Sequence, residues 1–407
     1  MAATKKRFRE GTHRAELIEA TLARLEPLLP RLGITRVANV TGLDVIGIPV
    51  VAAHRPNSRS LSVSFGKGVT LEAARASATM EALESYHAEH IQQPLLAGSF
   101  EELRRRRAVI NVAALPRLTV SSFHPDKTLL WIAGKELSDR SERWLPYELV
   151  HTDFRLPLPT GSGAFCMSSN GLASGNQLVE AELHGLCEVI ERDATTLWHA
   201  LSPARRAETK IDLGTIDDRL CCEVVAAVQN AGFALGVWEI TSDVRVPAFL
   251  ATVLELDTGV FGGIGNVSGM GCHPSRAVAL LRALTEAVQG RATLISGARD
   301  DLSHQTYRQQ RQDSRTRRMY RRAVDEPAAR AFRDSPSHDG DTFEDDLKWA
   351  LERLAEAGLR EAVSVELTHA DIGVPVARVV VPGLELMHDV PSYTPGQRAR
   401  RVLEHRS

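Results

Sequence analysis

The chain has 407 residues, of which 25% are charged and 43% are hydrophobic. These are ordinary globular proportions, and they exclude a wholly disordered chain. A formal net charge of −2 gives no overall attraction to nucleic acid or to an anionic membrane, so we expect neither as a partner. No apolar run approaches the roughly 20 residues that cross a bilayer, and no secretory signal is visible. The five cysteines have no zinc-binding spacing and indicate buried thiols of a cytoplasmic protein.

A pattern of helix, glycine, strand, turn and second strand occurs three times along the chain. The predicted helices span residues 16–31, 216–229 and 343–357, and a glycine follows each, as is common at helix ends. The predicted strand pairs are 34–40 with 46–51, 234–240 with 246–250, and 362–367 with 374–381. This repetition predicts an α+β fold in which residues 1–407 form a single domain built from three related units.

Two segments fall outside the repeated pattern. Residues 92–160 are irregular and contain many prolines, so we expect an insertion at the edge of the fold. Residues 303–342 are expected to form a mobile loop. Within it, Tyr307–Arg322 contains seven arginines, which fits a solvated surface loop or, as the less common alternative, a contact with a peptide or nucleic acid.

A predicted helix over residues 175–193 carries an unusual polar face. Asn176, Glu180, His184, Glu188 and Glu191 follow one another at spacings of four, four, four and three residues, so they project from one side. Such a stripe is usually a solvated face. However, carboxylates at this spacing repel one another unless positive charge lies between them. Mg²⁺ would relieve the repulsion, and it commonly brings phosphate oxygens as its other ligands.

Two further predicted helices carry faces of the same kind. They are residues 70–88, with Ser77, Glu81 and Glu84, and residues 275–289, with Arg282, Glu286 and Gln289. Arg291 is rotated away from the second face, and we expect Gly290 to end that helix and so correct its direction. Lys67 lies between two glycines, where backbone can approach a phosphate, although a plain tight turn is the commoner explanation of this tripeptide. Three mixed faces together predict a site for a nucleoside triphosphate with magnesium.

These residues resemble the three ATP-binding motifs of the YcaO family. The first motif is Ser77-x-x-x-Glu81-x-x-Glu84, the second runs from 169–176 through Glu180, Glu188, Glu191 and Arg192, and the third is Glu286-x-x-Gln289-x-Arg291. The resemblance reaches from the first helix to about Glu385, and it implies a YcaO fold that binds ATP and Mg²⁺. Ser85 is a departure, because many members have arginine there.

The resemblance also implies roles for individual residues. The implied Mg²⁺ ligands are Glu81, Glu84, Glu188 and Glu191. The implied ATP contacts are Ser77, Asn176, Glu180, Arg192, Glu286, Gln289 and Arg291, with Arg14 and Thr21 on the first helix; Lys67 joins them because of its flanking glycines. His184 shares the polar face of its helix, but a structural hydrogen bond is its commoner role. Cys187 and Cys272 flank motif residues, where packing is commoner than sulfur relay. We assign no catalytic residue.

Members of this family are implied to activate a peptide backbone amide. Once a nucleophile has added, the amide oxygen takes the γ-phosphoryl group and departs as phosphate. A Cys, Ser or Thr side chain then gives an azoline, sulfide gives a thioamide, and an amine gives an amidine.

Two features bear on the choice of nucleophile. The segments 11–14, 34–37 and 41–44 are similar to the subgroup that acts with a TfuA partner in thioamidation, and the Pro-x-Pro-x-Pro tail usual in azoline-forming members is not seen at the end of the sequence. We therefore expect thioamide formation on a ribosomally made precursor peptide, with a TfuA-like partner and a homodimeric enzyme. The alternatives are an azoline-forming cyclodehydratase or amidine formation and, from another class, a non-catalytic nucleotide-binding accessory protein for modification of a ribosomal protein.

Overall fold

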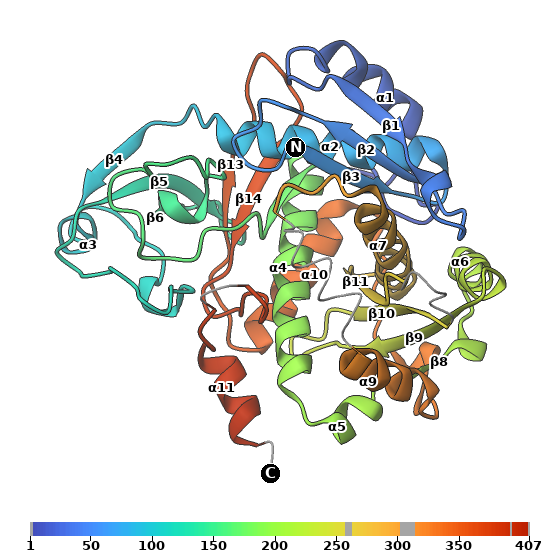
Figure 1. Cartoon of the computed structure of the whole chain (residues 1–407). Helices are drawn as coiled ribbons and strands as arrows, with labels where there is room; N and C mark the ends of the chain where they lie inside the picture. The colour runs from blue at the N-terminus through green and yellow to red at the C-terminus, as the bar shows by residue number, and fades with distance from the viewer. Residues whose placement is uncertain (1–2, 257–262, 302–313, 391–392, 406–407) are drawn as a thin grey trace.

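The structure is a computed structural model that describes residues 3–256, 263–301, 314–390 and 393–405. It contains the three helix and strand-pair units expected from the sequence, and the α+β prediction is confirmed (Figure 1). The first unit comprises α1 (Ile18–Leu25), β1 (Arg36–Asn39) and β2 (Val50–His54), the second α6 (Arg219–Asn230), β9 (Phe233–Glu239) and β10 (Ala248–Glu255), and the third α10 (Phe343–Glu356), β13 (Val363–Glu366) and β14 (Val376–Val380). Each strand pair is antiparallel.

The boundaries of the first strand pair differ from the prediction. Strand β2 begins at Val50 and not at Ile46, because Gly47 has a φ of 81° and Pro49 lacks an N–H group to donate to a neighbouring strand. Residues 46–49 therefore form a loop before the strand.

Each strand pair gains a third strand, and each third strand leads directly into a long helix. These strand and helix pairs are β3 (Val63–Lys67) with α2 (Leu71–Glu89), β7 (Leu172–Ser174) with α4 (Leu178–Ala200), and β11 (Asn266–Cys272) with α7 (Arg276–Ser296). The helices α2, α4 and α7 are the three for which the sequence predicts polar faces. In Figure 1, α4 runs through the middle of the molecule, with α2 and α7 near its first half.

Glycines in the third strands let these helices lie directly on the sheets. A Cβ atom at Gly271 of β11 would stand 2.1 Å from the carbonyl oxygen of Ala279 in α7, and one at Gly66 of β3 would stand 2.0 Å from the backbone nitrogen of Ala78 in α2. Both distances are far below van der Waals contact, so no larger residue fits without moving the helix. The glycines thereby fix the height of the helices above the strands.

Residues 95–149 extend the third sheet. They contain β4 (Leu95–Gly98), α3 (Phe100–Leu103), β5 (Leu129–Glu136) and β6 (Glu142–Pro146), with 3₁₀ turns at Val112–Ala114 and Tyr147–Leu149. Strand β5 pairs with β13, which gives a six-stranded sheet in which β4 and β6 flank β5. This segment forms the lobe at the left of Figure 1.

The remaining elements are short and peripheral. They are the helices α5 (Pro203–Ala207), α9 (Ser314–Asp325) and α11 (Gln397–Glu404), the strands β8 (Ile211–Asp212) and β12 (Arg330–Ala331), and 3₁₀ turns at Glu26–Leu28, Thr41–Leu43, Leu213–Thr215 and Phe332–Asp334. Of the segment expected to be a mobile loop, residues 303–313 lie outside the described residues. The part from residue 314 onward holds α9 and β12.

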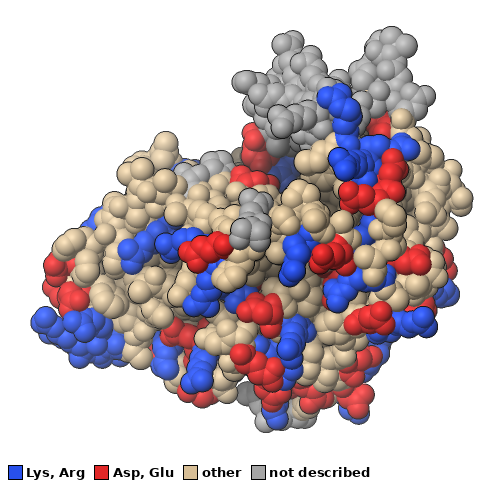
Figure 2. Space-filling model, turned by 90° about the horizontal axis from the view of Figure 1, so that it is seen from below, with Lys and Arg blue, Asp and Glu red and all other residues tan. Residues whose placement is uncertain are grey.

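The surface charge, the character of the helices and the burial of the cysteines can each be described from the structure. Basic and acidic side chains are interspersed on the face drawn in Figure 2, which fits the near-zero net charge. In the described part of the chain, no helix combines the length and the apolar character needed to cross a membrane. Four cysteines are buried as expected, but Cys222 is exposed, because the amphipathic helix α6 turns its neighbour Cys221 toward the core instead.

Candidate functional site

Acidic side chains from three helices meet between α2, α4 and α7. Glu84 of α2 accepts hydrogen bonds from the backbone nitrogen (2.8 Å) and the hydroxyl group (2.6 Å) of Ser174, at the end of β7 just before α4. Glu286 of α7 accepts a hydrogen bond from Met270 N at 3.3 Å. The first carboxylate is thus tied to the start of α4, and the second to β11. Glu81, Glu188 and Glu191 complete the group, which we call the carboxylate cluster.

Glu81, Glu84, Glu188 and Glu191 hold their protons more firmly than isolated carboxylates do. Burial raises the pKa of Glu191 to about 7, and Glu286 and Glu188 add to the rise against the opposing charge of Arg192. Burial likewise raises the pKa of Glu84 to about 8, with further contributions from Glu81 and Glu188. Glu81 contacts solvent, yet the surrounding protein limits its hydration and its pKa rises to about 7. The carboxylates are therefore short of positive charge.

Two basic residues partly neutralise the cluster. Arg192 of α4 lies 3.4 Å from Glu191 and 3.9 Å from Glu188. Lys67, at the end of β3, donates a hydrogen bond of 2.6 Å to Glu286. Burial by itself would raise the pKa of Glu286, but Lys67 and Arg192 outweigh it and hold the pKa below its ordinary value. The side of the cluster next to Lys67 is thus charge-balanced, whereas the α2 and α4 carboxylates are not.

A second polar network surrounds the start of α4. Asn176 and Glu180 lie here as predicted, and both contact the N-terminal segment. Arg14 lies 3.3 Å from Glu180, and the hydroxyl group of Thr21 donates a 2.9 Å hydrogen bond to Asn176 Oδ1. Arg24 donates to the same oxygen at 2.6 Å. Four of the predicted nucleotide contacts therefore lie together.

His184 connects this network to the carboxylate cluster. It stands on α4 between Glu180 and Glu188, and a guanidinium nitrogen of Arg282 in α7 donates to its Nε2. Burial lowers the pKa of His184 well below its ordinary value, and Arg282, Arg14 and Lys67 lower it further. The imidazole is therefore neutral and is surrounded by cations, as expected beside a binding site for an anion.

Three predicted residues make other contacts. Ser77 is half-buried on α2, one turn before Glu81. Gln289 donates a hydrogen bond of 2.9 Å to the carbonyl oxygen of Phe65 in β3. Arg291 forms a two-pronged contact with Asp44, at 3.0 and 3.2 Å, and stacks over the ring of Phe233.

The expectation that Gly290 ends its helix is wrong. Helix α7 continues to Ser296 and stops at Gly297, which has a φ of 62°. Arg291 therefore keeps the rotation that its place in the helix gives it, and it points to Asp44 and not to the carboxylate cluster.

Sequence reasoning did not assign three basic residues near the site. Arg24 lies one helical turn after Thr21, and Arg282 lies on the predicted polar face of α7 without an assigned role. Arg378 is buried in β14. Burial lowers the pKa of Arg378 to about 10, and the carboxylate of Glu188 opposes this decrease. A charged residue inside the apolar run of residues 374–381 was the signal that could have found it.

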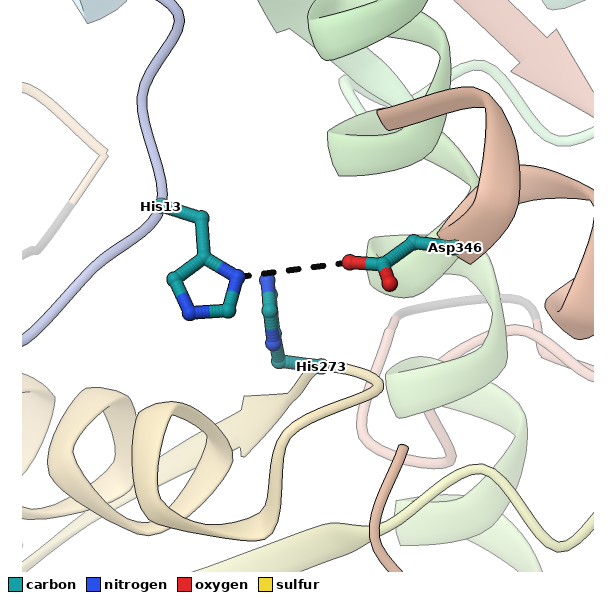
Figure 3. A group of neighbouring side chains, drawn as sticks. All are labelled: His13, His273 and Asp346. Atoms are coloured by element: carbon teal, nitrogen blue, oxygen red, sulfur yellow. Dashed lines mark ion pairs between the residues drawn. The ribbon is translucent and has the colours of Figure 1, made fainter. Parts of the chain in front are cut away.

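A separate cluster of potential metal ligands joins the N-terminal segment to α10. His13, His273 and Asp346 come from three distant parts of the chain, and their ligand atoms lie within 4.8 Å of one another (Figure 3). However, the Lys6 ammonium already lies 2.6 Å from Asp346 Oδ2 and supplies positive charge there. In addition, Ser275 N donates to Nδ1 of His273, which leaves the proton of the neutral ring on Nε2.

The contacts of Lys6 and His13 indicate that this cluster has a structural role and not a metal-binding one. Burial, followed by Lys6, lowers the pKa of His13 to about 4, so the ring is neutral at pH 7. A protonated Nε2 atom and a nearby ammonium group both disfavour a metal ion. The cluster instead attaches the segment that contains Arg14 to α10.

The cluster between α2, α4 and α7 has the chemistry of a site for a hard cation with a phosphate ligand. Carboxylate oxygens are the protein ligands that Mg²⁺ prefers. Raised carboxyl pKa values indicate that a cation is favoured there, and the guanidinium and ammonium groups around the cluster suit phosphate oxygens. Glu81, Glu84, Glu188 and Glu191 would hold the metal. The site therefore has the side chains to hold a divalent cation together with an anion that shares it.

Comparison with known proteins identifies the family. Residues 65–385 match the family described as YcaO cyclodehydratase, ATP- and Mg²⁺-binding, and the chain belongs to this family. That description agrees with the cofactors predicted. A protein from the tfuA 3′ region of Rhizobium leguminosarum bv. trifolii is 38% identical over 373 residues, which cover 90% of this chain and 87% of the relative. This relative agrees with the predicted subgroup.

Solved structures of low sequence identity share the fold. YcaO from Methanopyrus kandleri, bound with AMPPCP and Mg²⁺, has a TM-score of 0.75 at 23% identity, with 97% of this chain and 99% of that chain covered. A heterocyclase in complex with substrate and cofactor has a TM-score of 0.78 at 22% identity. The match covers 95% of this chain but 54% of the heterocyclase. The YcaO fold is therefore established for this chain.

Proposed function

We propose that this protein activates a peptide backbone amide by ATP-dependent O-phosphorylation, and that sulfide is the nucleophile, so that the product is a thioamide. The observation that carries the proposal is the carboxylate cluster, which brings together carboxylates from three helices, of which Glu81, Glu84, Glu188 and Glu191 have raised pKa values. Bound ATP supplies the γ-phosphoryl group that makes the amide oxygen a leaving group.

The residues of the site have distinct proposed roles. Glu81, Glu84, Glu188 and Glu191 hold Mg²⁺. Lys67 and Arg192 neutralise phosphate charge, and the network of Arg14, Thr21, Asn176 and Glu180 contacts the rest of the nucleotide, together with Ser77, Glu286 and Gln289. Arg291 acts indirectly, since its contact with Asp44 braces α7 against the first unit. Positioning and charge stabilisation are the protein's main contributions to phosphoryl transfer.

The choice of thioamide formation is supported by the relative from the tfuA 3′ region. We propose a TfuA-like protein as the partner that supplies sulfur or substrate, and a precursor peptide as the substrate. The two closest alternatives are azoline formation, which the family description favours, and a nucleotide-binding accessory role without turnover.

The test combines the purified protein with a candidate precursor peptide, Mg²⁺–ATP, a sulfide source and the TfuA-like partner. Replacement of oxygen by sulfur raises the peptide mass, whereas azoline formation lowers it by the mass of water. We expect a mass increase with release of ADP. Glu188→Gln should abolish both, and Glu352→Gln on the exposed side of α10 is the matched control that should retain them. Nucleotide binding with no mass change on any peptide would favour the accessory role.

A further inference from the structure

Arg378 is a buried arginine that lacks a direct carboxylate partner. It is 2% exposed and lies in β14, opposite Leu172 of β7 and Val365 of β13. Its Nη2 atom donates a 2.7 Å hydrogen bond to the carbonyl oxygen of Ser168. Its Nε and Nη1 atoms are buried and have no acceptor among the described residues. A buried charge with unused donors is costly, which indicates that these donors serve a ligand.

Other buried polar atoms in this region also lack partners. Asn170, two residues after Ser168, has an unpaired side-chain oxygen within the described structure. His151 is fully buried, and no side chain among the described residues hydrogen-bonds to its ring, which interacts with the backbone of Asp153. Burial and then Arg378 lower the pKa of His151, so the two side chains are electrostatic neighbours. The unused donors of Arg378 suit a ligand that accepts hydrogen bonds through oxygen, whereas the Asn170 oxygen suits a hydrogen-bond donor.

This region adjoins the carboxylate cluster at Glu188. Helix α4 lies directly on the chain at the start of β7. A Cβ atom at Gly185 of α4 would stand only 2.6 Å from the carbonyl oxygen of Gly171, the residue before β7. Arg378 and Glu188, one turn after Gly185, are electrostatic neighbours across this contact. Glu188 follows Glu180 by eight residues, which is about 12 Å along a helix. Arg378 is therefore associated with the metal end of the site and not with the network at the start of α4.

We propose that Arg378 binds the oxygen of the substrate amide, first as the carbonyl oxygen and then as part of inorganic phosphate. This inference rests on the proposed function. Hydrosulfide adds to the amide carbon, the oxygen takes the γ-phosphoryl group of ATP, and the carbon–oxygen bond then breaks. The products are the thioamide, ADP and hydrogen phosphate, which carries away the amide oxygen and the proton of the sulfur. Negative charge develops on the oxygen that the guanidinium group holds.

Arg378→Met tests first whether the guanidinium group has a structural role. Arg291→Met is the matched control, because Arg291 is 3% exposed and, unlike Arg378, forms a two-pronged ion pair with a carboxylate, that of Asp44. Without ligands, we expect the melting temperature of Arg378→Met to equal or exceed that of the wild type, since an unpaired buried charge is removed. Arg291→Met should melt lower. A clear decrease for Arg378→Met, or failure to fold, would show that Arg378 is a structural group and would overturn the proposal.

The second measurement is the affinity for inorganic phosphate, by calorimetry on the full chain with and without Mg²⁺–ADP. We expect Arg378→Met to weaken phosphate binding at least tenfold and Arg378→Lys to weaken it less, while both retain wild-type affinity for Mg²⁺–ADP. Unchanged phosphate affinity, or a wild type that does not bind phosphate, overturns the proposal. Loss of Mg²⁺–ADP affinity places Arg378 in the nucleotide site and also overturns it. If the wild type binds no Mg²⁺–ADP but the phosphate difference persists, the proposed function fails and the oxyanion site stands.

Discussion

Replacing Glu191 by glutamine should stabilise the metal-free protein. Glu191 is 4% exposed, and the fold raises its pKa from 4.5 to about 7. The folded state therefore binds more protons than the unfolded state between these values, and stability falls as the pH rises through them. With about 1.4 kcal/mol per pKa unit, ionised Glu191 costs about 3 kcal/mol at pH 8 and less than about 1 kcal/mol at pH 5. Glu191→Gln removes this cost.

The assay is thermal unfolding in EDTA at pH 5 and pH 8. An unfolding entropy of about 2.1 cal/mol/K per residue, applied to 407 residues, converts 3 kcal/mol into an increase of about 3–4 °C at pH 8 for Glu191→Gln. The increase should be much smaller at pH 5. Mg²⁺ should raise the melting temperature of the wild type at pH 8 and have less effect on the variant. A variant that melts below the wild type at pH 8 would refute the reasoning, because Glu191 would then be a stabilising partner of its neighbours. Glu352→Gln is the control for the substitution itself.

Other substitutions test the supports of the site. Arg291→Met should cost about 3–5 kcal/mol in urea unfolding, because it leaves Asp44 buried without its partner; a loss below 1 kcal/mol would contradict a structural role. Gly271→Ala should lower the melting temperature or the soluble yield, since the added methyl group meets the backbone of α7, whereas Gly42→Ala has open space and should be neutral. Lys67→Met should destabilise the metal-free protein by about 1–2 kcal/mol at pH 8. This loss should fade as the pH falls through the lowered pKa of the α7 carboxyl, because a protonated carboxyl needs no cation.

The sequence predicts the polar faces of the site well, because they depend on helical period alone. Spacings of three and four residues place Glu81 with Glu84, and Glu188 with Glu191, on one side of their helices. That the three helices converge could be argued from the number of such faces. The structure adds the reason, which is that each helix follows the third strand of a repeated unit and lies on glycines of that unit.

Residues that depend on tertiary contacts could not be predicted in this way. Glycine often ends a helix, yet α7 packs closely on its sheet and continues past Gly290 to Ser296. Arg291 therefore faces Asp44. Arg378 lies in a strand. The alternation of side chains along a strand indicates the face of the sheet on which Arg378 lies, but not the helix that packs on that face. Its proximity to Glu188 depends on the register between β14 and β7 and on the packing of α4.

The distribution of charge within the carboxylate cluster indicates where a cation would bind. Lys67 and Arg192 hold the pKa of Glu286 below its ordinary value, while burial and mutual repulsion raise the pKa values of Glu84 and Glu191. A divalent cation gains most where the carboxylates are least compensated, because its charge replaces protons there and does not have to displace an ammonium group. The metal should therefore sit between α2 and α4, and Glu286 should remain the partner of Lys67. In the proposed function, the carboxylates of α2 and α4 would hold the metal, and Lys67 and Arg192 would neutralise phosphate charge beside Glu286.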